Sequence, residues 1–333
     1  MIDFRYHLVS IIAVFLALAV GLLVGSTYLS GVNETILSNA QKALTKANDS
    51  LTTKNASQKQ QLSADQAFAQ AAARRLLNGL LTGQKVVLVE APNTDGQMTT
   101  GLIAALQEAG ATVTGTVVLQ PTFFDDGGQT ESSLTQLAQQ LAPQAGVTLP
   151  ASPAYPSVAG QEAASAVIAA SIANKNGINL TGSGVQSVLS GFAQNGYLAV
   201  QNLPSTGTAA LDPATMAVVL TPGGTAPQPT SQALVALAAQ LKLNSLATVM
   251  AGSLSGIQPG SPISLEGSSG PVSTVDNADT ESGQIMVVQT MKNVLDGQAP
   301  TSYGVEPGTA PSPAPTPSTT QTSGTTGSRR KHK

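Results

Sequence analysis

The feature that most constrains this chain is a run of 22 uncharged and mostly apolar residues, from Leu8 to Leu29. As an α-helix, this run would be about 33 Å long, which matches the hydrocarbon thickness of a bilayer. A cleaved secretory signal is the alternative, but its apolar region is normally about 7–15 residues long. Val24 and Ser26 imitate a cleavage site, yet the apolar pattern continues past them. We therefore predict an uncleaved transmembrane helix over residues 8–29, in contact with membrane lipid.

Small residues recur along one face of this predicted span. Ala13, Ala17, Gly21 and Gly25 follow one another at steps of four, and the last two form a GxxxG pair. Small residues at this spacing let two helix backbones approach closely. Because Ala and Gly are common in membrane spans, chance spacing is the alternative. The pattern favours association of the span with a second copy, and hence a homo-oligomer.

The charges that flank the span predict its orientation. Arg5 and the terminal amine precede the span, whereas Glu34 is the first charged residue after it and Lys42 is the first lysine. Positive charge is enriched on the cytoplasmic side of membrane spans. We expect residues 1–7 to be a cytoplasmic N-terminus and the rest of the chain to be extracytoplasmic.

The segment that follows, residues 33–80, predicts a coiled-coil stalk. Proline is absent from it, and leucines recur at seven-residue spacing with one step of eleven residues. A step of that kind locally unwinds a left-handed coil. Since Ala and Gln occupy many of the remaining core positions, a single solvated helix is the alternative. The predicted coiled-coil leucines are Leu37, Leu44, Leu51, Leu62 and Leu76.

The pattern changes at Gln84 to alternating strands and helices. Lys85–Glu90 is an apolar run typical of a buried strand, a helical pattern covers 98–109, and Thr112–Leu119 is a second strand. This order predicts a βαβ unit and therefore a parallel sheet. We predict an α/β fold, an open and mostly parallel sheet, over residues 84–304. Further helices are expected at 131–141, 160–174, 182–195, 230–241 and 282–295, and further strands at 197–203, 216–220, 245–250 and 272–275.

The remainder, residues 305–333, is rich in Pro, Thr and Ser and ends in five residues of which four are Lys or Arg. Such a composition cannot bury a core and predicts a disordered tail. Its basic end suits contact with anionic lipid or envelope polymer, although a solubilising tail is the simpler interpretation. Residues 86–328 carry a net charge of −11. This charge disfavours nucleic acid as a ligand.

The predicted domain lacks the side chains that most enzymes use. The chain has no Cys, and its two histidines, His7 and His332, lie outside residues 84–304. Neither a Gly-x-Ser-x-Gly elbow, nor HExxH, nor a P-loop is present, and the turn after the first strand is not GxGxxG. We therefore expect no catalytic residues, no evident cofactor and no enzymatic activity.

One acidic group stands between a predicted strand and a predicted helix. It consists of Asp276, Asp279 and Glu281. Carboxylates at the carboxyl end of a sheet strand are suited to a hard cation or a basic group of a partner. Acidic residues are also ordinary at a helix N-terminus, where they meet the helix dipole. Both interpretations stay open from the sequence.

Two segments together resemble the mycobacterial copper-transport protein B (MctB) family. Residues 3–25, which begin Asp-Phe-Arg-Tyr-His, resemble the start of that family. Val-Asp-Asn-Ala-Asp at 275–279, with Gly283-Gln284 and Tyr303-Gly304, resembles its C-terminal signature. The order of anchor, coil and α/β domain also matches, over about residues 1–304. The resemblance implies a membrane-anchored protein of the cell envelope that acts in copper export or homeostasis.

The residues themselves offer little to bind copper. Cu(I) prefers thiolate and thioether ligands. Cys is absent, and the five methionines after Met1 lie in apolar patterns that predict core positions. One membrane helix makes no pore by itself. We keep two hypotheses: a copper-handling protein of the envelope, and a non-catalytic envelope scaffold that binds a cell-wall or cell-division protein.

Overall fold

The computed structural model describes residues 4–175, 182–201 and 211–313. The chain divides into two units, Met1–Asp65 and Gln66–Lys333. The first unit is helical, and the second holds the sheet and the helices that cover it. The predicted tail from 314 onward lies outside the described residues.

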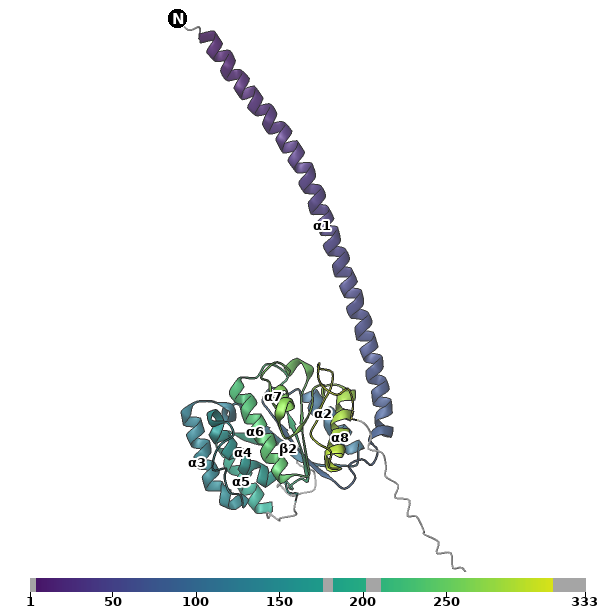
Figure 1. Ribbon diagram of the computed structural model, residues 1–333, viewed down its shortest axis with the longest axis vertical. Helices are drawn as coiled ribbons and strands as arrows, with labels where there is room; N and C mark the ends of the chain where they lie inside the picture. Colours follow the sequence, from purple (N-terminus) through teal and green to yellow (C-terminus); the bar gives the residue numbers. More distant parts are fainter. Residues whose placement is uncertain (1–3, 176–181, 202–210, 314–333) are drawn as a thin grey trace, which may run out of the picture. The chain divides into compact units, whose positions relative to one another are not determined.

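Helix α1, Phe4–Leu77, is continuous and supplies the helical part of the first unit (Figure 1). No Pro occurs before Pro92, so no residue in this stretch lacks the amide that a helix requires. Within α1, Tyr6–Ser26 has a mean hydropathy of 2.9 and is long enough to cross a membrane. The apolar N-terminal helix predicted from the sequence is therefore present. The helix ends at Leu77 and is followed by Gly79 at φ 78°, a conformation that glycine adopts without steric cost.

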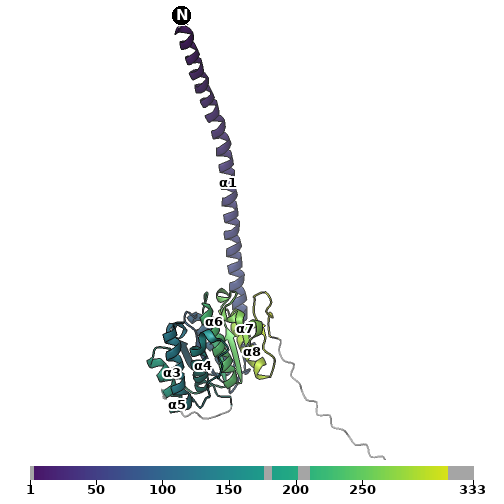
Figure 2. The ribbon, with the colours of Figure 1, turned by 60° about the vertical axis from the view of Figure 1, so that its left-hand side comes forward.

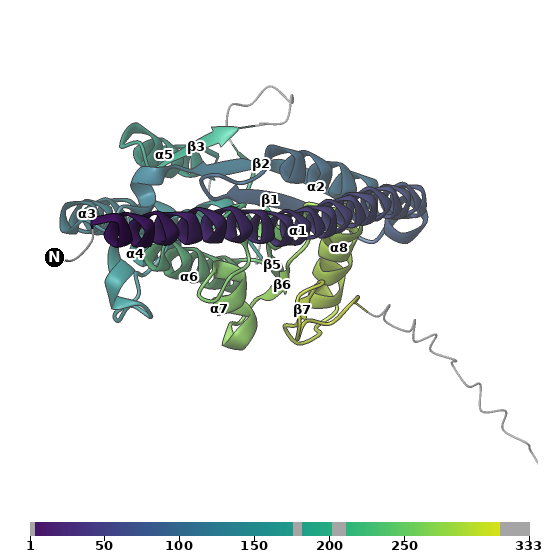
Figure 3. The same cartoon turned by 90° about the horizontal axis from the view of Figure 1, so that it is seen from above.

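The second unit is built on a seven-stranded sheet in the order β3-β2-β1-β4-β5-β6-β7. Every pairing is parallel except β2 with β3, and Figure 3 shows β3 and β7 at opposite edges. This confirms the predicted open, mostly parallel α/β sheet. The strands are β1 Lys85–Glu90, β2 Thr112–Leu119, β3 Leu198–Gln201, β4 Met216–Leu220, β5 Ala247–Ala251, β6 Ser273–Val275 and β7 Ser302–Tyr303.

Helices cover both faces of this sheet. Figure 2 shows α3, α4 and α5 gathered on one side and α8 on the other. Two apolar clusters match this arrangement: one contains residues of α3 to α6, and the other contains residues of α2, α8 and the end of α1. The helices are α2 Gly96–Glu108, α3 Gly128–Ala145, α4 Ala159–Ile172, α5 Gly182–Gln194, α6 Gln228–Asn244, α7 Pro262–Ser269 and α8 Glu281–Leu295, with short 3-10 turns at Pro121–Phe124, Pro156–Val158 and Leu254–Gly256.

Strand β1 is apolar at successive positions because both of its faces are covered. Val87 and Val89 belong to the first apolar cluster, whereas Val86 and Leu88 belong to the second. Successive side chains of a strand point to opposite faces of a sheet. A central strand covered on both faces therefore needs apolar residues throughout, as is typical of parallel sheets.

The last turns of α1 belong to the second unit and pack into its core. Ala73 and Leu77 are buried in the second cluster together with Leu81. Arg74 forms an ion pair with Glu108 of α2 at 3.4 Å. The C-terminal end of the helix is thus part of the α/β domain.

The domain extends beyond the predicted boundary at 304. Strand β7 pairs with β6, and the amide of Gly304 donates to the carbonyl of Ala310 at 2.9 Å. The amide of Ala310 in turn donates to the carbonyl of Ser302 at 2.8 Å. Residues 305–310, which the sequence analysis placed in the tail, thus follow β7 closely and end at a residue that is hydrogen-bonded to it. A two-residue strand is too short to show a period in the sequence, and its pairing partner, β6, lies almost 30 residues earlier in the chain.

Candidate functional site

The edge of the sheet where the parallel strands end, called here the carboxyl edge, is where open α/β sheets bind ligands. Ligands usually bind at the topological switch point, where the connections from two neighbouring strands run to opposite sides of the sheet. In this sheet that point lies between β1 and β4, because the chain continues from β1 to β2 on one side and reaches β4 on the other. The loops that begin at Ala91 and Thr221 follow these two strands.

Direct hydrogen bonds join these two loops. The amide of Gly223 donates to the carbonyl of Asn93 at 3.0 Å, and Asn93 adopts a positive φ of 62°. The hydroxyl of Thr94 donates to the carbonyl of Ala91 at 2.8 Å and contacts that of Thr221 at 3.4 Å. The loops thus hold each other in place across the switch point.

The acidic residues of the carboxyl edge come from two elements that the sequence places far apart. Asp95, the N-cap of α2, accepts from the amide of Gln97 at 2.8 Å. Asp276 directly follows β6, and Asp279 lies three residues later. Burial raises the pKa of Asp279, a hydrogen bond from its own backbone opposes this, and the carboxylates of Asp95 and Asp276 raise it further.

Asp276 holds the C-terminal end of the domain. It is fully buried, and its two carboxylate oxygens accept from the amides of Val305 and Glu306, both at 2.9 Å. Gly304 has a φ of 146°, and an added Cβ there would overlap the Asp276 carboxylate. The sequence signature that links residues 275–279 with Tyr303-Gly304 is therefore a physical contact in the fold.

Glu281, the third acidic residue of the predicted site, lies in the first turn of α8. Thr280 caps that helix, since its side chain accepts from the amide of Gly283 at 3.1 Å. Glu281 lines a small pocket between α1, α2 and α8 together with Gln70, Glu108 and Gln284. A carboxylate in a first turn is favourable next to the helix dipole, which accounts for its place without a ligand. A cation or partner site at Asp276, Asp279 and Glu281 stays a prediction.

The described residues hold no group of three or more His, Cys, Asp or Glu side chains placed to bind a metal ion. The five methionines of the domain are at most 7% exposed, and four of them share the second apolar cluster: Met98, Met216, Met286 and Met291. Thioether sulfur is a soft ligand that suits Cu(I). Because these side chains are buried in a closely packed core, they do not present a donor set to a copper ion from outside.

The predicted association residues lie on exposed parts of α1. Ala13, Ala17, Gly21 and Gly25 are exposed, and an added Cβ at either glycine would meet no atom within 4 Å. The coiled-coil leucines are also exposed: Leu37 by 70%, Leu44 by 71%, Leu51 by 59%, Leu62 by 54% and Leu76 by 47%. Their pairing with another chain stays a prediction.

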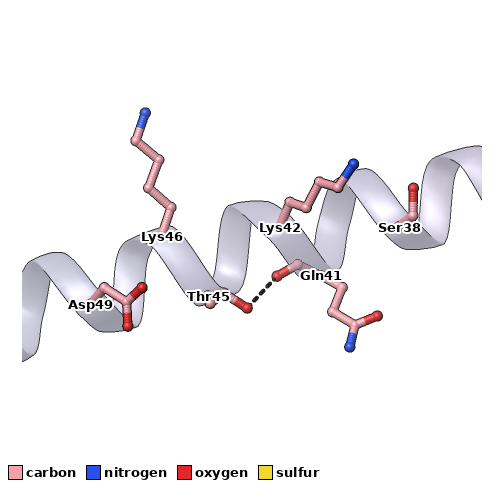
Figure 4. A pocket seen from close by; sticks show the side chains of 6 residues that line it. All are labelled: Ser38, Gln41, Lys42, Thr45, Lys46 and Asp49. Carbon is pink, nitrogen blue, oxygen red and sulfur yellow. Dashed lines mark hydrogen bonds between the residues drawn. The ribbon is translucent and has the colours of Figure 1, made fainter.

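The surface hollow drawn in Figure 4 lies on this same helix. All six side chains that line it come from consecutive turns of α1, and the hydroxyl of Thr45 donates to the carbonyl of Gln41 at 2.9 Å. Lys42 and Lys46 extend away from the helix. A hollow on one face of one helix has no opposing wall to enclose a small ligand, so we do not regard it as a binding site.

Glu266 is the titratable group that the sequence did not reveal. It is 1% exposed, its Oε1 accepts from the amide of Val272 at 2.6 Å, and its Oε2 has no hydrogen-bond partner among the described residues. Burial raises its pKa to about 7, although the Val272 amide and the charge of Lys242 act in the opposite direction. The only signal in the sequence is a carboxylate within a short apolar helix. That signal does not distinguish a buried group from an exposed one.

Comparisons with known proteins show that most of the chain is similar to copper transporters. The family model described as "Copper transport outer membrane protein, MctB" matches residues 1–314. The Copper transporter MctB of Mycobacterium tuberculosis (strain ATCC 25618 / H37Rv) is 26% identical over 329 residues, which cover 91% of this chain and 96% of the relative. The Copper transporter MctB of Mycobacterium leprae (strain TN) is 27% identical over 331 residues, with 92% and 96% covered.

Proposed function

Because this chain belongs to the MctB copper transport family, we propose that it acts in copper homeostasis as a single-pass, non-catalytic protein of the cell envelope. The observation that carries the proposal is the extent of the match, residues 1–314, which includes the apolar helix, the rest of α1 and the described α/β domain. A match confined to the domain would support only a common fold.

In this proposal the domain acts through a protein partner rather than by holding copper itself. The buried thioethers and the absence of Cys support this division of roles, because Cu(I) prefers soft sulfur ligands and none is accessible in the described domain. The carboxyl edge, with Asp95 and the exposed Asp279, is the surface that we propose for the partner. A basic segment suits it, because burial and, to a smaller extent, the carboxylates of Asp95 and Asp276 raise the pKa of Asp279, and a nearby cation would offset the repulsion among these carboxylates.

We also propose that residues 1–7 lie in the cytoplasm and that the domain lies on the other side of the membrane. The charges that flank the span support this orientation. Since the chain has no native Cys, a Gln140→Cys variant provides one exposed thiol in the domain. A membrane-impermeant maleimide should label it in intact cells. Labelling only after lysis would reverse the proposed orientation.

The copper proposal is tested by comparing a strain that lacks the gene with its parent in copper-containing medium. We expect raised cell copper and greater copper sensitivity with normal septation, and we expect the full chain supplied in trans to restore the parental copper level and tolerance. That complementation is the control for effects on neighbouring genes. Unchanged cell copper in the deletion strain would overturn the proposal.

The same comparison addresses a second candidate, an envelope scaffold for a cell-wall or cell-division protein. The observation that favours it is the exposed stretch of α1 between Leu37 and Leu62, combined with a domain whose described residues offer no fitting copper ligands. A scaffold predicts altered septation or wall sensitivity with normal cell copper. The two hypotheses therefore make opposite predictions for cell copper.

A further inference from the structure

A row of leucines lies along the part of α1 that belongs to the first unit. Leu37, Leu44, Leu51 and Leu62, called here the stalk leucines, are each between 54% and 71% exposed. The first three are seven residues apart, with Ala40 and Ala47 between them at the intermediate positions. A leucine spacing of seven places the side chains on one face of a helix. Within the described part of the chain, none of these four leucines is buried.

The residues in Figure 4 form a different face of the same stretch. If Leu37 and Leu44 occupy heptad position a, then Lys42 and Asp49 occupy position f and Lys46 occupies position c. None of the six residues drawn falls at position a or d. Positions b, c and f point away from the partner in a coiled coil, where charged side chains stay hydrated. The division into an apolar and a polar face is what a two-stranded coil requires.

We propose that this stretch of α1 pairs with that of a second copy of the chain as a parallel, two-stranded coiled coil centred on Leu37, Leu44 and Leu51. A second copy is the occupant that we infer because it carries the same spacing, so that each leucine meets its equivalent. The apolar helix Tyr6–Ser26 would give two copies the same orientation in one membrane, which makes the pair parallel. Confinement to a membrane also raises the effective concentration of the two helices.

The structure sets the extent of the pairing segment. Beyond Leu62 the seven-residue spacing falls on Ala69, which packs against the apolar cluster of its own domain. Lys54, at a d position, follows Leu51, and polar side chains at core positions weaken a coil while fixing its register. The paired segment therefore covers residues 37–62, a length of about 39 Å, with local unwinding at the eleven-residue step between Leu51 and Leu62. This inference does not depend on the copper proposal.

The absence of native Cys allows a direct test on the full chain in its membrane. A Leu44→Cys variant places a thiol at position a, and a Lys46→Cys variant places one two residues away at position c, as a matched control. Under mild oxidation with diamide we expect disulfide-linked dimer from Leu44→Cys, with at least about tenfold less from Lys46→Cys. Equal yields, or no dimer from either variant, would overturn the proposal.

Two further measurements separate the stalk from the membrane span and fix the number of strands. In a variant that also carries Gly21→Leu and Gly25→Leu, the Leu44→Cys dimer should persist, and its loss would assign the pairing to the span instead. With Gly21→Leu and Gly25→Leu present to remove association of the span, the mass of the full chain in detergent should correspond to two copies, and to one copy after Leu37, Leu44 and Leu51 are also replaced by Gln. A mass of three or more copies, or one that the substitutions leave unchanged, would contradict a two-stranded stalk.

Discussion

Replacing Glu266 by Gln tests the energetics of the domain most directly, because this carboxyl is buried and its Oε2 has no partner among the described residues. Its environment is specific: Gly270 lacks the Cβ that would overlap Oε1, and the Val272 amide donates to that same oxygen. Lys242, the cation that lowers its pKa, donates to the carbonyl of Pro271. Burial outweighs these favourable contacts and raises the pKa from 4.5 to about 7.

The sign of the pH effect follows from this raised pKa. Below about pH 4.5 the carboxyl is protonated in both the folded and the unfolded chain. In that range the group therefore does not make the free energy of unfolding depend on pH. Between about 4.5 and 7 the unfolded chain releases its proton while the folded chain keeps it, and the free energy of unfolding falls as the pH rises. The shift corresponds to about 3 kcal/mol, and above about pH 7 the loss is complete. A glutamine side chain cannot ionise, so this part of the slope should vanish in Glu266→Gln.

The assay is urea unfolding of the full chain in detergent, followed by tyrosine fluorescence at several pH values from 4.5 to 8. At pH 8, Glu266→Gln gains up to about 3 kcal/mol relative to the parent, because its side chain cannot ionise. It loses about 1 kcal/mol of this gain, because its buried amide lacks an acceptor. The variant should therefore be the more stable of the two. Glu108→Gln, at a half-buried residue that pairs with the exposed Arg74, is the matched control for the loss of one carboxyl group and should keep the part of the slope that Glu266 supplies. A parent and a Glu266→Gln variant with equal slopes over this range would refute the reasoning.

Two other substitutions probe the ends of the domain. Leu77→Ala should lower the free energy of unfolding by about 2–5 kcal/mol in the same urea assay, because it leaves a cavity where α1 enters the core. A change below about 1 kcal/mol would show that this turn does not stabilise the domain. Asp276→Ala removes the acceptor of two backbone amides, which should cost about 3 kcal/mol and speed proteolytic cleavage near Gly304. Cleavage at the parental rate would argue against this carboxylate as the anchor of the C-terminal segment.

The parts of the fold that the sequence predicted well are those in which local pattern and tertiary burial agree. Strand β4, predicted at 216–220, is observed at Met216–Leu220, because all five residues are apolar and all five are buried in the sheet. Helix α8 was expected from 282 and begins at Glu281, one residue earlier. In both cases the burial that the fold imposes is the burial that the residue types already favour.

The parts that were missed depend on contacts between distant segments. Strand β7 has two residues and exists because β6 and Ala310 pair with it. Helix α7 has eight residues, too few for a clear helical period. That β3 runs antiparallel to β2 follows from its neighbours in space and not from its own side chains. These elements carry little information in their local sequence.

The sequence indicates only some of the acidic residues that lie at the carboxyl edge, and the fold shows why. Asp276 and Asp279 were identified because they follow a strand, but Asp95 belongs to a turn more than 180 residues earlier and joins them only through the sheet order. The role of Asp276 as an acceptor for Val305 and Glu306 likewise needs the folded chain. A motif in a sequence shows which residues matter, whereas their partners depend on topology.

Membership in a copper transport family, with one membrane-length helix among the described residues, sets a condition on how this protein works. An α-helix satisfies its own backbone hydrogen bonds and encloses no path, so one copy of α1 cannot conduct an ion across a membrane. A path must then lie between several chains or within another protein. The stalk leucines bear on this choice, because a paired stalk brings two spans together in one membrane. If the Leu44→Cys variant stays monomeric under oxidation, the stalk does not bring two spans together, and a path between chains would have to rest on the association of the spans themselves.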